Sequence, residues 1–410
     1  MAMSAAVPST TTVRPEIQAL RAIAVAAVVL HHGWPAVAPA GYIGVDVFFV
    51  VSGYLITALL LREVDRTGRI SLGSFYLRRA RRILPAAMVV LLAVSAATLA
   101  FAPYRDWAAY FREIVASAFY VENWRLAVDS QQPAFADLES TPVQHFWSLS
   151  VEEQFYLLWP LLIIAALWLV HRRGAPLRRT LAIVLGAVTA VSFAWSLLLT
   201  VDDHNLAYFS TFARGWEFGV GGLLALLAAA IPRLTADRWH AGRSVVSWAG
   251  LAMIVVPIVT FDDTEAFPGL WVLLPVAGTL AIIWAGAPGT RWSTARAAGL
   301  RPVQWVGDVS YSLYLWHWPI FMFTPMITGV PSPPALMVVL VGLSLVVAAL
   351  SKRFVEDPFR RRGGAVGSHP RVLAGALAVA LAGVLTMGSV APGIAADELV
   401  CQGQGRSPRD

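Results

Sequence analysis

Residues 43–62 read IGVDVFFVVSGYLITALLLR, an apolar run in which Asp46 is the one charged side chain ahead of the closing Arg62. A helix of about 20 residues is about 30 Å long, which matches the hydrocarbon core of a bilayer. The run therefore predicts a transmembrane helix that carries an ionisable group inside it.

Similar apolar runs recur on both sides of this stretch along the 410-residue chain. Their length and low charge predict an all-α integral membrane protein, a polytopic bundle of about 10 core transmembrane helices plus an eleventh C-terminal helix. The approximate spans are 17–36, 43–62, 83–102, 146–170, 180–200, 209–231, 244–261, 270–287, 303–328, 335–352 and 371–391.

Composition supports this class and excludes others. Hydrophobic residues make up 57% of the chain and charged residues 14%, with a mean hydropathy of +0.64. This leaves too few charges to cover soluble domains. The net charge of +6 does not indicate nucleic-acid binding, because the basic residues sit in short loops between apolar runs. The single cysteine, Cys401, predicts neither a disulfide framework nor a zinc site.

Loop charges give the expected orientation. Alternate loops on one side of the bundle carry 23 of the 31 Lys and Arg residues, whereas the segments on the other side carry five. Because basic residues accumulate on the cytoplasmic side, we expect a multi-pass protein of the cell (inner or plasma) membrane with a cytoplasmic N-terminus and an extracytoplasmic C-terminus. The long outer loop, 103–145, contains an amphipathic stretch from Asp106 to Arg125, which predicts a short surface helix.

Several ionisable residues fall inside the expected spans, where such groups are costly and usually functional. Arg21 and His32 are 11 positions apart, which places them on nearly one face of a helix, about 16 Å apart along its axis. The groups expected in the outer half of the membrane are His32, Asp46, Glu152, Glu217 and His317. A histidine with a carboxylate is the usual equipment for general-base catalysis, so His32 and Glu152 are candidate catalytic residues.

Helical spacing groups the remaining candidates. Ser148, Glu152 and Tyr156 share one face, and so do Ser310, Tyr314 and His317. Structural alternatives remain open: a transmembrane histidine such as His317 often only joins two helices, and Arg214 and Glu217 could simply neutralise each other at i, i+3. The basic cluster at 78–82 either marks the inner face or attracts an anionic ligand.

Five ordered motifs across residues 14–362 resemble the acyltransferase-3 family of integral membrane O-acyltransferases, in the branch similar to bacterial O-antigen acetylases. The motifs are RPEIQALR at 14–21 leading to His32, GVDVFF at 44–49 with Ser52-Gly53, FYLRRARRILP at 75–85, FWSLSVEEQFY at 146–156, and SYSLYLWHWP at 310–319 with VEDPFR at 355–360. The resemblance implies an acyltransferase-3 transmembrane domain over 1–362, followed at 363–410 by the eleventh helix and a short outer tail.

The resemblance also implies the chemistry. An acyl group, expected to be acetyl, would pass from cytoplasmic acyl-CoA as co-substrate to a hydroxyl of a cell-envelope glycan or sugar, with no metal and no permanently bound cofactor. His32 would act as the base and Glu152 would orient it, with Asp46 as a third catalytic residue. Donor-binding residues would be Arg21, Arg79 and Arg82. Residues expected to bind substrate are Glu153, Arg214, Glu217, Tyr314 and His317.

The end of the sequence and the alternative functions complete the interpretation. Many members of this branch carry an extracytoplasmic SGNH-type domain after the eleventh helix, whereas this sequence ends about 20 residues later, so we expect that domain on a longer product or on a separate protein. A small secreted molecule such as a macrolide is an alternative acceptor. A secondary transporter is the rival of another class, which the lack of paired halves and the separation of the His/Glu and Arg groups disfavour.

Overall fold

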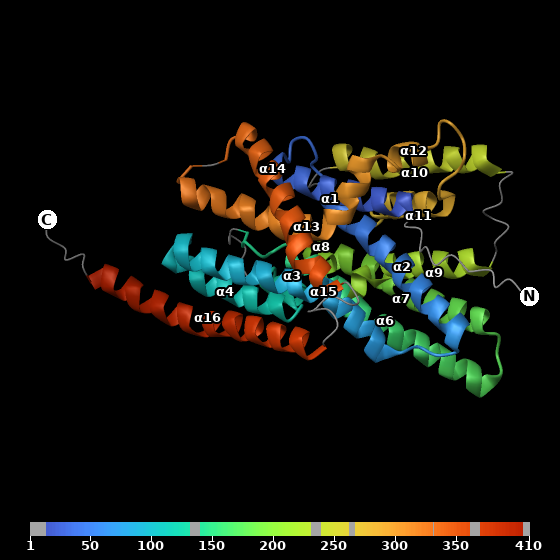
Figure 1. Ribbon diagram of the computed structural model, residues 1–410, viewed down its shortest axis with the longest axis horizontal. Coiled ribbons are helices and arrows are strands. Elements are labelled where there is room, and N and C mark those ends of the chain that lie inside the picture. Colours follow the sequence, from blue (N-terminus) through green and yellow to red (C-terminus); the bar gives the residue numbers. More distant parts are fainter. Residues whose placement is uncertain are drawn as a thin grey trace, which may run out of the picture.

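The computed structural model describes residues 14–131, 140–230, 239–261, 267–330, 332–360 and 370–404. This part of the chain is helical and contains no strand (Figure 1). Its helices are α1 (Pro15–Gly33), α2 (Gly44–Thr67), α3 (Leu72–Phe101), α4 (Tyr104–Ala118), α5 (Glu122–Asp129), α6 (Phe146–Arg173), α7 (Leu177–Asp202), α8 (His204–Phe209), α9 (Thr211–Ala230), α10 (His240–Thr260), α11 (Leu273–Ala285), α12 (Thr294–Ala298), α13 (Arg301–Thr328), α14 (Pro334–Ser351), α15 (Asp357–Arg360) and α16 (Pro370–Gln404).

Seven helices of the described residues are long and apolar enough to cross a bilayer, which confirms a polytopic membrane protein. They correspond to the expected spans at 43–62, 83–102, 146–170, 180–200, 244–261, 335–352 and 371–391. The other four expected spans fall on α1, α9, α11 and α13. Of these, α11 has only 13 residues, and the other three carry charged or histidine side chains inside the bundle. The count of eleven spans therefore stays a prediction.

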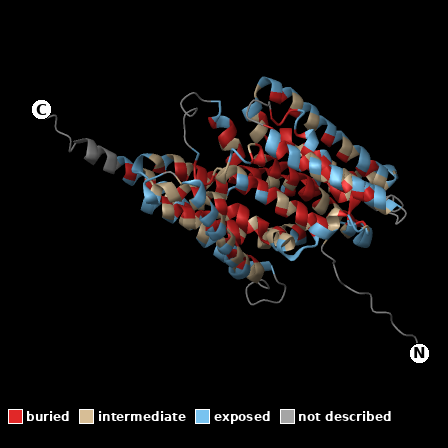
Figure 2. Cartoon of the chain, turned by 90° about the horizontal axis from the view of Figure 1, so that it is seen from above, coloured by how far each residue is buried: buried red, intermediate tan, exposed pale blue. Residues whose placement is uncertain are grey.

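Helix α2 lies in the middle of the bundle, in contact with α1, α6, α9 and α11. The buried residues concentrate there, whereas the outward faces of the surrounding helices are exposed (Figure 2). Gly53 allows α2 to approach α9, because a Cβ at this position would collide with the backbone of Phe218. Gly307 lets α13 approach α1 in the same way, against the backbone of Gln18. These close contacts fix α1, α2, α9 and α13, four helices that carry most of the predicted site.

The amphipathic stretch at 106–125 does form helices, α4 and the start of α5. Helix α4 buries Trp107, Tyr110, Phe111 and Ile114. It contacts α3 and α16, which lie along one edge of the molecule (Figure 1). The C-terminal helix α16 thus belongs to the α3–α4 edge of the bundle.

Candidate functional site: two adjoining chambers

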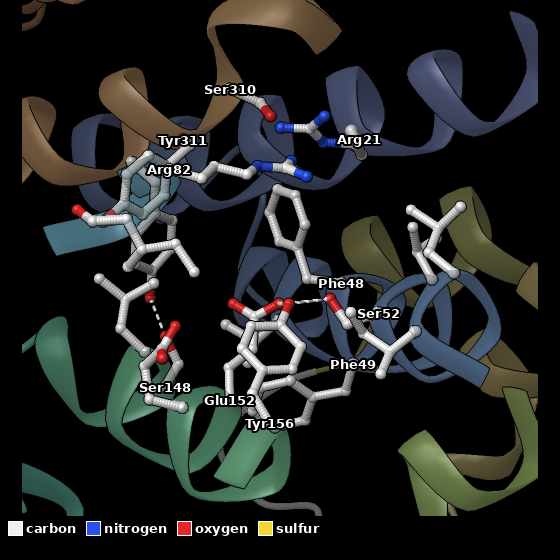
Figure 3. Close-up of a pocket in the computed structure, with 18 of the residues that line it drawn as sticks. Arg21, Phe48, Phe49, Ser52, Arg82, Ser148, Glu152, Tyr156, Ser310 and Tyr311 are labelled. Carbon is white, nitrogen blue, oxygen red and sulfur yellow. Dashed lines mark hydrogen bonds between the residues drawn. The ribbon is translucent and has the colours of Figure 1, made fainter. Parts of the chain in front are cut away.

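The first chamber has an empty volume of about 860 Å³ and is bounded by α1, α2, α3, α6 and α13. We call it the arginine chamber, after Arg21, Arg79 and Arg82, which all line it. Figure 3 shows Arg21 and Arg82 side by side, with Ser310 beside them. Glu152 and Tyr156 stand on the opposite wall. The three residues predicted to bind the donor are therefore brought together.

The acidic wall of the arginine chamber comes from one face of α6, as the i, i+4 spacing predicts. Ser148, Glu152 and Tyr156 all line the chamber, and so does the neighbouring Glu153. The hydroxyl groups of Ser52 and Tyr156 both donate to Oε1 of Glu152. Because two donors converge on one oxygen, the carboxylate is held in place on the chamber wall.

The guanidinium groups opposite are held differently. Arg21 donates to the side-chain oxygen of Gln18 at 3.1 Å, and Arg79 lies over the ring of Tyr156 at 5.2 Å. Within the described part of the chain, none of Arg21, Arg79 and Arg82 forms an ion pair. Three such groups without a carboxylate partner in one partly buried cavity are suited to bind an anion.

The second chamber has an empty volume of about 750 Å³ and lies at the C-terminal end of α1. We call it the histidine chamber, after His31, His32 and His145 on its walls. Its other walls are mostly aromatic, and they comprise Tyr42, Trp147, Tyr208, Phe209 and Trp318. Such a cavity combines flat apolar surfaces with a few ring nitrogens that can take or give hydrogen bonds.

The hydrogen bonds of His32 fix which of its nitrogens is the base. Nδ1 of His317 lies 3.0 Å from the carbonyl oxygen of Leu313, which can only accept, so this nitrogen carries the hydrogen. In the neutral ring, Nε2 of His317 is then an acceptor, and it lies 3.0 Å from Nδ1 of His32. Nδ1 of His32 must donate, which leaves Nε2 of His32 with its lone pair free to act as a base.

Tyr314 and Val45 line both chambers and so form the partition between them. The Tyr314 hydroxyl lies 2.6 Å from Oγ of Ser148 and donates to the carbonyl oxygen of His145 at 3.1 Å. The partition is thus a hydroxyl-bearing ring tied to the start of α6. A group bound in the arginine chamber and a group bound in the histidine chamber would meet at this residue.

Asp46, Arg214 and Glu217 form a closed ionic triplet between α2 and α9. Arg214 is fully buried, donates to Asp46 and to Glu217 at 2.5 Å, and is surrounded by aromatic rings. None of the three lines either chamber. The structure therefore does not place the predicted catalytic Asp46, or the predicted substrate-binding Arg214 and Glu217, where a ligand in these cavities would reach them.

The structure also changes the roles predicted for Glu152 and His317. The expectation that Glu152 orients His32 is wrong for this conformation, because Glu152 is bound to Ser52 and Tyr156 while His32 is bound to His317. His317 is fully buried behind His32 and lines neither chamber, so it is placed to position His32 rather than to contact a ligand. Glu153 and Tyr314, by contrast, do line a chamber.

Sequence reasoning did not single out Ser52 as the partner of Glu152, or His145 as a wall of the histidine chamber. Ser52 directly precedes Gly53 and belongs to the second of the five motifs, and this membership was the signal that could have marked it as a site residue. His145 directly precedes the α6 motif, but helical spacing could not relate it to His32, because His145 stands in the turn before α6 and His32 lies on α1.

The comparison with protein families matches an acyltransferase domain over residues 14–353. The chain belongs to the acyltransferase-3 family. The matched region contains both chambers and every candidate residue named above. It is similar to the peptidoglycan O-acetyltransferase OatA of Listeria monocytogenes, with 32% identity over 85% of this chain and 56% of the relative. It is also 32% identical to the O-acetyltransferase OatA of Staphylococcus aureus (strain NCTC 8325 / PS 47), over 85% of this chain and 57% of the relative.

The acyltransferase-3 chain described here spans somewhat over half the length of the curated relatives it matches. No solved structure matches it. The family assignment therefore rests on sequence.

Proposed function

We propose that this protein transfers an acetyl group from acetyl-CoA, which enters the arginine chamber from the cytoplasm, to a hydroxyl group presented in the histidine chamber. One observation supports this most directly. Three arginines that form no ion pair with any described residue, and an imidazole with a free nitrogen, line adjoining cavities that share Tyr314. Phosphate binding and general-base catalysis are thus available on two sides of one partition.

Arg21, Arg79 and Arg82 would bind the phosphate groups of the donor by charge-assisted hydrogen bonds. The expected orientation supports entry from the cytoplasm, because Arg79 and Arg82 belong to the predicted inner basic cluster. Glu152 and Glu153 on the facing wall would accept hydrogen bonds from the amide groups of the donor's pantetheine arm. The donor would thus lie between a cationic and an acidic wall, with its thioester toward Tyr314.

The transfer itself would use His32 as the general base. Nε2 of His32 takes the proton of the acceptor hydroxyl while the hydroxyl oxygen attacks the thioester carbonyl carbon. A carbon–oxygen bond forms and the carbon–sulfur bond breaks. The proton held by His32 then passes to the departing CoA thiolate. His317 keeps the imidazole in the required tautomer throughout, because its Nε2 accepts the hydrogen of Nδ1 of His32.

The acceptor we propose is a hydroxyl of a cell-envelope glycan, because one relative is named a peptidoglycan O-acetyltransferase. The relatives are longer than this chain, and an SGNH-type region on another chain or on a longer product would complete delivery to the glycan. The bundle would cross the membrane eleven times, with the N-terminus in the cytoplasm.

The test is reconstitution of the 410-residue protein in proteoliposomes with radiolabelled acetyl-CoA. We expect saturable, arginine-dependent donor binding and slow release of acetate, and transfer to an envelope glycan only when an SGNH-type protein is supplied. His32→Ala should abolish acetate release and transfer, whereas Glu152→Gln should reduce them less, since the base survives. Turnover of His32→Ala within about threefold of the wild type would contradict the assignment of the base.

A further inference from the structure

His145 is a buried histidine of the histidine chamber to which the proposed transfer assigns no role. His145 directly precedes α6 in the chain and is 4% exposed. Nε2 lies 3.2 Å from the carbonyl oxygen of Leu315, which can only accept, so Nε2 carries the hydrogen. Nδ1 of the neutral ring is then an acceptor. It is buried and has no hydrogen-bond partner among the residues that the structure describes.

A buried acceptor without a partner costs about 1–3 kcal/mol. The ring is held in this orientation, because Nε2 is bound to the carbonyl oxygen of Leu315 and the ring packs against those of Tyr314 and His317. His145 is also on the chamber wall. A ligand group that reaches this ring from the chamber and donates a hydrogen bond to Nδ1 would remove this cost.

His32 presents the same kind of group to the same chamber. Its Nδ1 hydrogen is used by His317, so Nε2 offers only a lone pair. The two rings belong to α1 and to the start of α6, yet both have their N–H groups committed to protein partners. His31 on the same wall has Nδ1 bound to the carbonyl oxygen of Ala38 at 3.0 Å, so its Nε2 is an acceptor as well. The chamber therefore presents several imidazole acceptors, and a ligand suited to it carries several hydrogen-bond donors.

Other walls of the same chamber are flat aromatic rings. The Trp318 ring lies 4.3 Å from the His32 ring, and its Nε1 donates to the carbonyl oxygen of Thr141 at 2.8 Å. Trp147 packs against Tyr208 with ring centroids 4.6 Å apart. Rings fixed in this way can pack against the C–H faces of a sugar ring while its hydroxyl groups reach the imidazoles.

We propose that the histidine chamber binds a polyol acceptor by two hydroxyl groups, the reacting one at Nε2 of His32 and a second one at Nδ1 of His145. His145 would then select acceptors that carry this second hydroxyl. The inference rests on the proposed function, because it takes His32 as the base that receives the reacting hydroxyl. It adds that the reacting hydroxyl in the histidine chamber belongs to a polyol, and not to an isolated alcohol.

The test measures binding without turnover, so that it does not depend on a partner protein. The full chain in nanodiscs is titrated with methyl glucopyranoside and with each of its monodeoxy analogues, and binding is followed by tryptophan fluorescence, since Trp147 and Trp318 line the chamber. We expect the wild type to bind the parent glycoside saturably. At least one monodeoxy analogue should bind about 5–150-fold more weakly, as expected for a buried group left unpaired.

Two substitutions of His145 separate recognition from structure. In His145→Asn the amide oxygen takes the place of Nδ1, so discrimination between the parent and the deoxy analogue should persist. In His145→Gln the amide takes the place of Nε2, which preserves the bond to Leu315 and removes the Nδ1 acceptor. Discrimination should then fall to within about threefold.

Equal discrimination in both variants would overturn the role of His145, and so would the absence of saturable glycoside binding by the wild type. Failure of the proposed function is seen separately, as loss of arginine-dependent acetyl-CoA binding in the same nanodiscs. A chain that binds donor but discriminates no glycoside therefore refutes this inference alone.

Discussion

Nδ1 of His32 lies 3.0 Å from Nε2 of His317, with the two imidazole rings nearly parallel at 10°, although the residues are 285 positions apart. The partner of the candidate base is thus a second histidine, which is itself fixed by the carbonyl oxygen of Leu313. In the proposed mechanism His317 would serve the purpose of the third member of a catalytic triad without placing a carboxylate beside the base.

This relationship predicts different outcomes for two substitutions of His317. His317→Ala removes the acceptor for Nδ1 of His32, so kcat for acetate release should fall about 10²–10³-fold while KM for acetyl-CoA stays within about threefold. His317→Gln places an amide oxygen near the position of Nε2 and should recover most of the loss. Steady-state kinetics with both variants tests this. A loss of kcat as large in His317→Gln as in His317→Ala would show that hydrogen bonding to His32 is not what matters.

We expect acetyl-CoA to bind in the arginine chamber. Arg79→Ala and Arg82→Ala should each weaken acetyl-CoA binding about tenfold or more, since each removes a charge-assisted hydrogen bond. The effect should be larger at low ionic strength, because salt screens the phosphate contact. Arg81→Ala is the matched control, since Arg81 lies on the same helix and lines neither chamber. Equilibrium binding of labelled acetyl-CoA gives the answer, and unchanged affinity in both chamber variants would refute the site.

The buried triplet predicts a stability effect rather than a catalytic one. Arg214→Met leaves Asp46 and Glu217 without a counter-ion in a fully buried position, which should cost about 3–5 kcal/mol. Adding Asp46→Asn and Glu217→Gln removes the uncompensated charge and should restore much of the stability. Thermal unfolding in detergent, followed by size-exclusion chromatography, compares the single and triple variants. A triple variant no more stable than Arg214→Met would contradict an electrostatic role.

Glu122 on α5 is expected to make a pH-dependent contribution to the free energy of unfolding. Burial, reinforced by the neighbouring Glu113, raises the pKa of Glu122 well above its ordinary value of 4.5. Because the folded state binds this proton more tightly, the contribution to stability is largest below the unfolded pKa and is lost as pH rises through the folded pKa. Glu122→Gln should therefore raise the unfolding temperature at pH 8 and change it little at pH 4. Parallel melting curves of the variant and the wild type at every pH would contradict this prediction.

The sequence by itself determined the class of fold and two walls of the arginine chamber. Apolar runs of bilayer length allow little but membrane helices, because backbone groups in lipid must be satisfied within the helix. The period of 3.6 residues places Ser148, Glu152 and Tyr156 on one face of α6, and all three do line the arginine chamber. The clustering of Arg79 and Arg82 on that chamber follows from the same periodicity.

Only the tertiary structure decided which of these residues are partners. Helical periodicity orders side chains along one helix, but the packing of helices decides which faces meet. His32 therefore pairs with His317 across α1 and α13, and Glu152 pairs with Ser52 across α6 and α2. The chemistry of the side chains alone had predicted a pair between His32 and Glu152. Arg214 likewise finds Asp46, 168 positions away, because α2 and α9 approach closely at Gly53. The sequence set the inventory of charged groups within the bundle, and the close packing of small residues between helices set their pairing.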